Sequence, residues 1–451
     1  MQITYWLLAL PLFLFGFSME YAIGSQGKQP NVLLIIVDDL GFADLGCLGS
    51  EDLNTPHIDR LFDQSLRLNR LYANCPVCSP TRASVLTGCY PDRVGVPGVI
   101  RTHPENSWGN FAPIAKTLPE RLREEGYLTK GIGKWHLGLT EEDHPLKHGF
   151  DHFHGFLGDM MDDYYHHRRH GQNYMVKDRA EIDPEGHATD LFSQWASDWI
   201  ASRKSETADQ PWFLYLAYNA PHTPIQPPSD WLSKVENRSP ELTKSRAKLV
   251  ALIEHMDDGI GSVLRSLEEN SNGRETIVIF TSDNGGQVNV GANNGPLRDG
   301  KQSMYEGGLR IPGCIKVPGI TVPGSASDAV CTTADFYPTV MDALDLETDK
   351  HLDGISLTSI FENLNHSWHD REIYFVRREG GSRYAGLSIE AVLRGDLKLV
   401  HNLPTGDFEL FDLKSDPYET RDLAMDRPKD LSMMIRRLQF HLQRGGKKPW
   451  Q

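Results

Sequence analysis

The sequence is poor in basic residues, with 46 Lys and Arg against 61 Asp and Glu and a formal net charge of −15. Because nucleic acids bind to basic protein surfaces, this balance argues against DNA or RNA as a partner. An acidic protein that binds an anion needs a local pocket of Arg, Lys and His instead. The chain has 451 residues, 39% of them hydrophobic, enough for a large domain with a smaller one, or for a single elaborate α/β unit.

Cysteine is also scarce. The six cysteines fit an exported protein but are too few for a dense disulfide framework. Cys75 and Cys78 have C-x-x-C spacing, which also occurs in redox pairs and in half of a zinc site. A redox pair normally lies in a small thioredoxin-like domain, and no second C-x-x-C or Cys/His cluster supports zinc. We therefore expect Cys75 to be a buried small residue or to pair with another cysteine such as Cys89.

Long apolar runs are missing except near the N-terminus. Residues 3–17 form an apolar run too short to span a bilayer comfortably, and the small residues Ala22 and Gly24 follow it. We predict a signal peptide at residues 1–24 and an exported protein, periplasmic or secreted, with no stable membrane span after cleavage. No Lys or Arg precedes the run, so a retained membrane anchor and a cytoplasmic protein with an incidental apolar N-terminus stay open as alternatives.

Buried-strand patterns alternate with helical patterns over most of the chain. Strands are expected within 31–46, 128–138, 211–222 and 275–286, and helices at 117–127, 187–203 and 245–270. This alternation predicts the α/β class, with a large, mostly parallel sheet flanked by helices. After about residue 345 the pattern changes to short strands and turns, and a final helix is expected around 429–444. We predict a main domain at 25–345 and a smaller C-terminal α+β subdomain at 346–451, with an antiparallel sheet and a terminal helix.

Oxygen-bearing side chains follow two of the expected strands directly. Asp38 and Asp39 follow the first, and Asp283 and Asn284 follow another. In open parallel sheets, ligands bind beyond the carboxyl ends of the strands. These four side chains suit a hard divalent cation, Ca²⁺ or Mg²⁺, although paired aspartates more often cap helices and turns.

Basic side chains are expected at the same edge of the sheet. Any one of them alone is more often a surface charge or a structural histidine. Together they predict a clamp for a tetrahedral oxyanion beside the cation. Pro80 suits the first turn of a helix, whose free N–H groups would also favour an anion. The basic residues are Arg82, Lys134, His136, His222 and Lys301.

Two motifs indicate a family. Residues 78–88, CSPTRASVLTG, have a C-x-P-x-R pattern with a T-G ending, and GYLTKGIGKWH follows at 126–136. On these motifs the chain resembles the type I, arylsulfatase-like sulfatases of the alkaline phosphatase superfamily, over about residues 31–423. The resemblance implies an alkaline phosphatase-like fold and a sulfuric ester hydrolase. It also implies that a formylglycine-generating enzyme oxidises Cys78 to formylglycine, whose hydrated form attacks sulfur and later releases sulfate as the aldehyde re-forms.

The resemblance also assigns roles to the other candidates. One Ca²⁺ is expected to bind the modified Cys78 and the four strand-end residues Asp38, Asp39, Asp283 and Asn284. Asp283 is also expected to take the proton of the attacking hydroxyl, and Arg82 to hold the hydrated aldehyde. Among the remaining residues, Lys134 and Lys301 grip sulfate oxygens, Lys301 or His222 protonates the leaving alcohol, and His136 is the base that regenerates the aldehyde.

The polar stretch 149–175 is rich in His, Arg, Asp and Tyr and is expected to line the mouth of the pocket. This composition suits a sulfated carbohydrate as substrate, although a solvated loop with an accidental histidine cluster is an equally simple reading. The candidate substrate-binding residues are His166, His167, Arg168, Arg169 and His170.

Two other functions stay open. One is a phosphomonoester or phosphonate hydrolase of the same superfamily. Two lysines and two histidines in the expected site favour a sulfate ester instead, because they suit a monoanionic ester. The other is a non-catalytic binding or scaffold protein, which the complete set of motif residues argues against.

Overall fold

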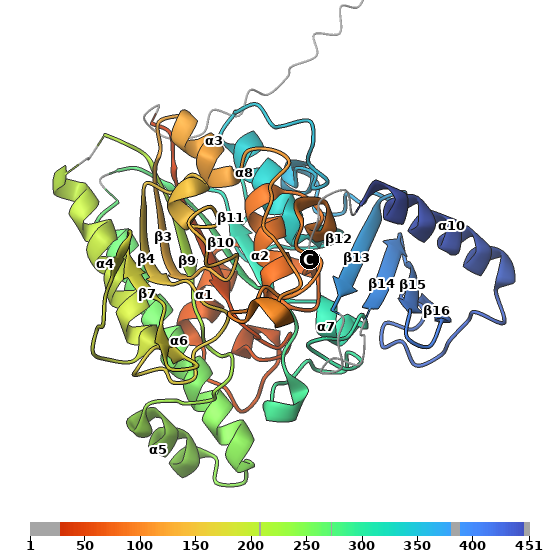
Figure 1. Cartoon of the computed structure of the whole chain (residues 1–451), viewed down its shortest axis with the longest axis horizontal. Helices are drawn as coiled ribbons and strands as arrows, with labels where there is room; N and C mark the ends of the chain where they lie inside the picture. Colours follow the sequence, from red (N-terminus) through yellow and green to blue (C-terminus); the bar gives the residue numbers. More distant parts are fainter. Residues whose placement is uncertain (1–27, 207–208, 272, 380–387, 446–451) are drawn as a thin grey trace, which may run out of the picture.

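The computed structural model describes residues 28–206, 209–271, 273–379 and 388–445. The predicted signal peptide at 1–24 lies outside these residues. Within them, the main sheet has ten strands in the order β12-β2-β11-β10-β1-β9-β3-β4-β7-β8 (Figure 1). Their bounds are β1 Asn31–Val37, β2 Leu66–Tyr72, β3 Leu128–Lys134, β4 His152–Phe156, β7 Met175–Lys177, β8 Ala180–Glu181, β9 Trp212–Ala217, β10 Thr276–Ser282, β11 Gly313–Lys316 and β12 Ala326–Thr332.

The centre of the sheet is parallel. Strands β10, β1, β9, β3 and β4 pair in parallel, whereas β11 and β7 flank them in antiparallel orientation. Every residue of β1 is buried because helices cover both faces, as its continuous apolar sequence predicts. The predicted α/β class with a mostly parallel sheet is confirmed. The first part of 149–175, expected as a polar insertion, instead forms β4, an integral strand of this sheet.

Helices cover the two faces of the sheet, as Figure 1 shows for α4 and α6 on one side and α2 and α8 on the other. Alternate residues of β1 point to opposite cores, with Val32 and Leu34 facing α2 and α8 and with Leu33 and Ile35 facing α4 and α6. The helix bounds are α1 Pro56–Asp63, α2 Cys78–Thr87, α3 Leu118–Glu124, α4 Ala188–Glu206, α5 Ser229–Arg238, α6 Lys244–Glu269, α7 Glu306–Leu309, α8 Phe336–Ala343, α9 Thr358–Glu362 and α10 Pro428–Arg444.

A second, four-stranded antiparallel sheet follows in the C-terminal part, in the order β13-β14-β15-β16. One face packs against the main domain through Tyr72, Met304 and Leu309, and the other packs against α10 through Met434 and Leu438. This is the predicted small subdomain with its terminal helix, whereas the division at residue 345 stays a prediction. The strand bounds are β13 Glu372–Arg378, β14 Ser388–Arg394, β15 Leu397–Asn402 and β16 Asp407–Asp412.

All six cysteines lie in the described part of the chain and have free thiols. Cys75 and Cys89 are both buried and are not joined to each other. Among the described residues, no helix combines the length and the apolar composition that crossing a bilayer requires.

Candidate active site

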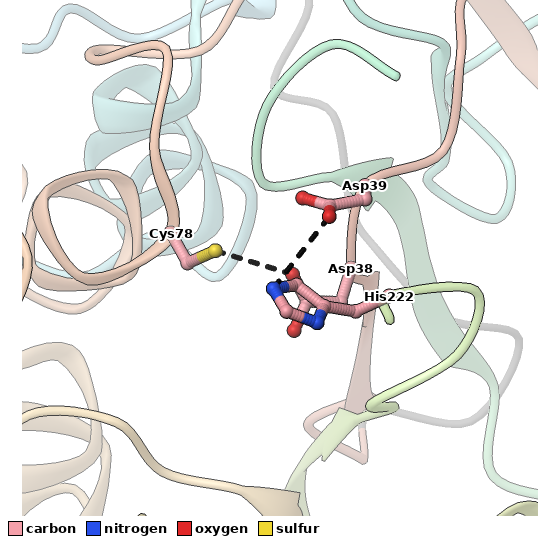
Figure 2. A group of neighbouring side chains, drawn as sticks. All are labelled: Asp38, Asp39, Cys78 and His222. Atoms are coloured by element: carbon pink, nitrogen blue, oxygen red, sulfur yellow. Dashed lines mark hydrogen bonds and ion pairs between the residues drawn. The ribbon is translucent and has the colours of Figure 1, made fainter. Parts of the chain in front are cut away.

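Helix α2 places Cys78 at its first position. The helix is buried along its whole length, and the N-cap residue Val77 offers no side-chain hydrogen bond to the free N–H groups of the first turn. Such a buried N-terminus favours a negative charge beside it. The Cys78 thiol donates a hydrogen bond to Asp38 Oδ1 over 3.2 Å (Figure 2). Position 78 therefore directly contacts the strand-end carboxylates.

The parallel register of β1 and β10 brings the acidic strand ends together. Val37 pairs with Ser282, so the residues that follow each strand leave the sheet at the same level. Asp283 Oδ1 accepts a hydrogen bond from the Asp39 backbone N–H over 3.3 Å, and Asn284 Nδ2 donates to Asp39 Oδ1 over 2.8 Å. Asp39 itself has a φ of 68°, in the left-handed region that non-glycine residues rarely adopt.

Buried cations balance these carboxylates. Arg82 Nη2 lies 2.8 Å from Asp283 Oδ2, and Lys134 Nζ pairs with Asp38 Oδ2. The cluster therefore contains the basic groups that the strand-end motifs predict.

Two further basic groups reach Asp39 from loops. Lys301 Nζ lies 2.7 Å from Asp39, and His222 Nε2 lies 3.6 Å from Asp39 Oδ2, the second contact being drawn in Figure 2. His136 does not bind these carboxylates through Nε2, because that nitrogen lies 2.8 Å from the carbonyl oxygen of Ile100.

The donor atoms suit a hard cation. The side-chain oxygen Oδ1 of Asn284 is buried and accepts no hydrogen bond within the described residues, so it is free to bind an ion. Carboxylate and amide oxygens are the ligands that Ca²⁺ prefers. Four possible ligand atoms lie within 4.8 Å of one another, from Asp38, Asp39, Cys78 and His222. Asp283 and Asn284 adjoin this group, and the oxygen atoms of these residues could hold a hard divalent cation.

Burial and charge set the protonation states. Burial opposes ionisation of Asp38, but Lys134 and the other nearby cations outweigh it and hold the pKa of Asp38 well below its usual value. Burial raises the pKa of Asp283 to about 7, and the charge of Asp38 adds to the shift. Burial, again helped by Asp283 and Asp38, raises the pKa of the Cys78 thiol well above its usual value. A thiol here would stay protonated and would be a poor nucleophile.

A cavity of about 320 Å³ opens above Cys78, His136, His222 and Lys301. It is also lined by residues that the motifs do not predict, Arg101 and Arg377 among them. Glu379 binds both, because its Oε2 lies 2.6 Å from Arg101 and its Oε1 lies 3.0 Å from Arg377. The remaining lining residues are Val77, Val99, Asp159, Met160, Arg169, Thr223, Gln287 and Gln302.

Arg377 is 1% exposed, but the sequence did not single it out, because Glu372 and Arg378 of the same strand are charged as well. Arg101 was not singled out either, because it lies in an irregular loop.

Of the five predicted substrate-binding residues, Arg169 lines the cavity, where Asp159 Oδ1 holds its Nε at 2.9 Å. The other four lie outside this lining. Arg168 pairs with Asp183 at 2.8 Å, and the buried His167 contacts the Gly186 carbonyl oxygen through Nε2. His166 is exposed near Asp163, and His170 is exposed with its ring centroid 4.4 Å from that of His103.

The chain matches known families over most of its length. Residues 30–346 match the Sulfatase family, and residues 299–447 match the family described as N-sulphoglucosamine sulphohydrolase, C-terminal. The chain is 30% identical to arylsulfatase J of Mus musculus, covering 92% of this chain and 76% of that protein. It is 32% identical to N-acetylgalactosamine-6-sulfatase of Homo sapiens, with coverages of 79% and 70%.

Solved structures agree with these matches. The crystal structure of Ps i-CgsB is similar with a TM-score of 0.84 and 30% identity, covering 94% of this chain and 95% of that one. Its complex with k-i-k-neocarrahexaose is similar with a TM-score of 0.82, also at 30% identity, over 91% and 92% of the two chains. Since sequence, fold and motif residues agree, the chain belongs to the type I sulfatases of the alkaline phosphatase superfamily and is a sulfuric ester hydrolase.

Proposed function

We propose that this sulfatase hydrolyses sulfate monoesters of a carbohydrate, with formylglycine at position 78 and one Ca²⁺ as its cofactors. The observation that carries the proposal is the 3.2 Å contact between the Cys78 thiol and Asp38, which puts the motif cysteine against the oxygen-rich strand ends. A carbohydrate is supported by the similarity to a sulfatase crystallised with a neocarrahexaose and to an N-acetylgalactosamine-6-sulfatase.

Asp38, Asp39, Asp283 and Asn284 would hold the calcium ion, which would supply positive charge for an anionic oxygen at position 78. Formylglycine would supply a hydrated carbonyl as the nucleophile, where a buried thiol would stay protonated. A formylglycine-generating enzyme is therefore a required partner in maturation. We also propose export of the protein, in line with its apolar N-terminus.

The cationic side chains would bind and orient the sulfate group. Lys301 lines the cavity beside Asp39, within reach of an anion that enters it, and Lys134 is fully buried beside Asp38. Arg82 is held by Asp283 and donates to the Lys134 carbonyl oxygen over 3.3 Å, so its charge is fixed in place. Preorganised charges of this kind stabilise the transition state without reorganisation.

The hydrogen bonds of the histidines indicate where protons reside. His222 Nδ1 lies 2.7 Å from the Thr223 carbonyl oxygen and therefore carries the proton, which leaves Nε2 as an acceptor facing Asp39. Burial lowers the pKa of His222, so the neutral ring has no proton to give at Nε2. Burial would also lower the pKa of Lys301, but Asp39 outweighs it and the net shift is upward. Lys301 is thus the group that still carries a proton for the leaving alcohol, although its raised pKa makes it a weak acid.

His136 is suited to act as a base. Because its Nε2 donates to the Ile100 carbonyl oxygen, its buried Nδ1 is a free acceptor in the wall of the cavity, with no partner among the described residues. This arrangement matches the role of the residue that removes a proton from the nucleophile after the alcohol has left.

Mass spectrometry tests the modification. Protein coexpressed with a formylglycine-generating enzyme is denatured, alkylated and digested with trypsin, which releases the peptide 71–82 with both Cys75 and Cys78. Conversion of Cys78 leaves one alkylated cysteine in this peptide instead of two, and Cys75 serves as an internal control. Two alkyl groups on all copies of the peptide would contradict the formylglycine proposal.

Activity of the modified protein tests the reaction and the substrate. We expect hydrolysis of nitrophenyl sulfate and of at least one defined sulfated sugar, with nitrophenyl phosphate much slower. Cys78→Ala should abolish this activity, and EGTA should remove it reversibly, with recovery on adding Ca²⁺. Turnover of nitrophenyl sulfate without turnover of any sulfated sugar would refute the carbohydrate assignment alone.

A further inference from the structure

A second cavity adjoins the catalytic one. It has a volume of about 280 Å³ and lies between the segment 299–305 and the C-terminal sheet. Among the described residues, Gln302 alone lines both cavities. The two cavities are each near the lower end of the size range of small-molecule sites. They are therefore neighbouring compartments that share one side chain at their boundary.

Gln302 is held in an unusual conformation at this boundary. Its φ is 79°, which is uncommon for a residue other than glycine and is maintained only where the surroundings impose it. Its backbone N–H donates to the Pro76 carbonyl oxygen, and its own carbonyl oxygen accepts from Arg377 Nη1, each over 2.9 Å. The exposed side-chain amide makes no hydrogen bond in the described part of the chain. It is thus free to bond a ligand that spans the two cavities.

The second cavity has an apolar wall and a polar rim. Met304, Ile389 and Val400 form the apolar part, and the rim includes the amide of Asn402. The Asn402 side chain has no hydrogen-bond partner among the described residues. An apolar wall with convergent hydrogen-bonding groups suits a sugar ring, which has apolar C–H faces and hydroxyl edges.

Charge distinguishes the two cavities. The catalytic cavity is lined by four Lys and Arg side chains, Arg101, Arg169, Lys301 and Arg377. The second cavity is lined by Asp299 and Glu409, and its described lining contains no Lys or Arg. Arg298, which is outside this lining, lies against the Tyr305 ring at 3.5 Å and pairs with Glu409 at 3.6 Å. A sulfate group would be repelled here, whereas an uncharged sugar would not.

We infer that the substrate is an oligosaccharide whose sulfated unit enters the catalytic cavity while an adjoining uncharged sugar unit occupies the second cavity, with the Gln302 amide bonded between them. The inference rests on the proposed carbohydrate sulfatase function and specifies its substrate class. Asn402 and Gln302 become specificity residues that act on the neighbouring unit rather than on the sulfate.

The test compares substrates of different length. Sulfated monosaccharides, oligosaccharides with an unsulfated neighbouring unit and oligosaccharides with a sulfated one are assayed beside nitrophenyl sulfate. We expect the wild type to prefer an oligosaccharide with an uncharged neighbour. Gln302→Gly keeps the backbone conformation and removes the amide, so it should lower kcat/KM for that oligosaccharide about three- to tenfold more than it lowers kcat/KM for nitrophenyl sulfate. Asp345→Gly is the matched control, since Asp345 is exposed with a φ of 57° far along the chain from either cavity.

Introducing a positive charge into the second cavity provides an independent test. Asn402→Arg places a cation in the second cavity and should shift preference toward oligosaccharides with a sulfated neighbouring unit. The inference is overturned if the wild type has equal kcat/KM values for mono- and oligosaccharides. It is also overturned if these variants change kcat/KM for nitrophenyl sulfate as much as they change it for the oligosaccharides. Either result would leave carbohydrate sulfatase activity intact. If the wild type cleaves nitrophenyl sulfate and no sulfated sugar at all, the proposed function fails first and the inference falls with it.

Discussion

Asp257 is a buried carboxylate outside the active site. It lies on α6 and accepts hydrogen bonds from the backbone N–H groups of Ile58 and His57, over 2.7 and 3.2 Å, at the start of α1. Burial raises the pKa of Asp257 to about 7, although these two hydrogen bonds oppose the shift. The folded state therefore binds the Asp257 proton more tightly than the unfolded state does, between pH values of about 4 and 7.

The sign of this linkage predicts a pH dependence. Because the folded chain holds more protons in that window, the contribution of Asp257 to the free energy of unfolding falls as the pH rises from about 4 to about 7, and is constant above it. Asp257→Asn removes the titration, so the wild type should lose stability relative to this variant over that window. Urea unfolding at a series of pH values measures the difference. Asp258→Asn, at a 56% exposed neighbouring side chain, is the control. The prediction would be contradicted if the free energy of unfolding changed with pH in the same way for the wild type and for Asp257→Asn.

The sequence predicts single residues well where a motif carries chemistry. Asp38 and Asp283 could be placed near each other because their strands end at one edge of a parallel sheet, whereas Cys78, at the start of α2, was joined to them by the family resemblance. Arg101 and Arg377 could not, because they reach the cavity through loop geometry and through the docking of a second sheet. Neither feature has a periodic pattern in the sequence.

At the scale of elements, the segment between β4 and β7 supports the loop that carries His222. The hydroxyl of the buried Tyr164 lies 2.8 Å from the Asn219 carbonyl oxygen and 2.9 Å from that of His222. Gln226 ties the same two segments together, since its side chain bonds both the Tyr164 N–H and Asp163, each over 2.8 Å. The polar composition of this segment led to a prediction of substrate contacts, whereas much of it anchors a neighbouring loop.

Tyr164→Phe tests this positioning. The variant removes the hydroxyl from two buried carbonyl groups, so we expect a loss of about 1–3 kcal/mol in the free energy of unfolding and a several-fold lower kcat on nitrophenyl sulfate with little change in KM. Tyr165→Phe is the matched control, because Tyr165 is 39% exposed and adjacent in sequence. Wild-type kcat in a destabilised Tyr164→Phe protein would show that Tyr164 has a structural role alone.

The sequence predicts correctly the longer strands β1, β3, β9 and β10 of the main sheet, whereas β2, β7, β8, β11 and β12 were not expected. The buried strands and the helix α6 have the expected positions because both their length and their periodicity are distinctive. The strand β4 was also missed, since its short sequence HFHGF has two apolar side chains three positions apart and so lacks the alternation typical of a strand.

At the scale of the whole molecule, a buried ion network joins the two sheets. Lys398 on β15 is fully buried and lies 2.9 Å from Glu306 and 2.8 Å from Glu419. Tyr72 on β2 donates to the other oxygen of Glu306 over 2.9 Å. Glu306 begins α7, five residues after Lys301, so the network also anchors the loop that brings Lys301 to the active site.

Removing the cation should therefore affect both stability and activity. Lys398→Met leaves two buried carboxylates without their partner, and we expect a loss of about 3–5 kcal/mol in the free energy of unfolding together with reduced sulfatase activity. Arg60→Met is the control, because its pair with Glu268 is 62% and 55% exposed and should contribute less than about 1 kcal/mol. A change in stability for Lys398→Met no larger than that of Arg60→Met would show that the network does not hold the subdomains together.

The ion group Arg101–Glu379–Arg377 joins side chains from both parts of the chain in the wall of the catalytic cavity. The proposed nucleophile and the proposed cation ligands come entirely from the first part, whereas Arg377 and most of the second cavity's apolar wall come from the second. The proposed ester-cleaving groups thus lie in the first part, whereas both parts contribute to the proposed sugar-binding walls. An exchange of the C-terminal part between related sulfatases would therefore change the wall that faces the neighbouring sugar, and it would keep activity only if the Lys398–Glu306 contact were retained.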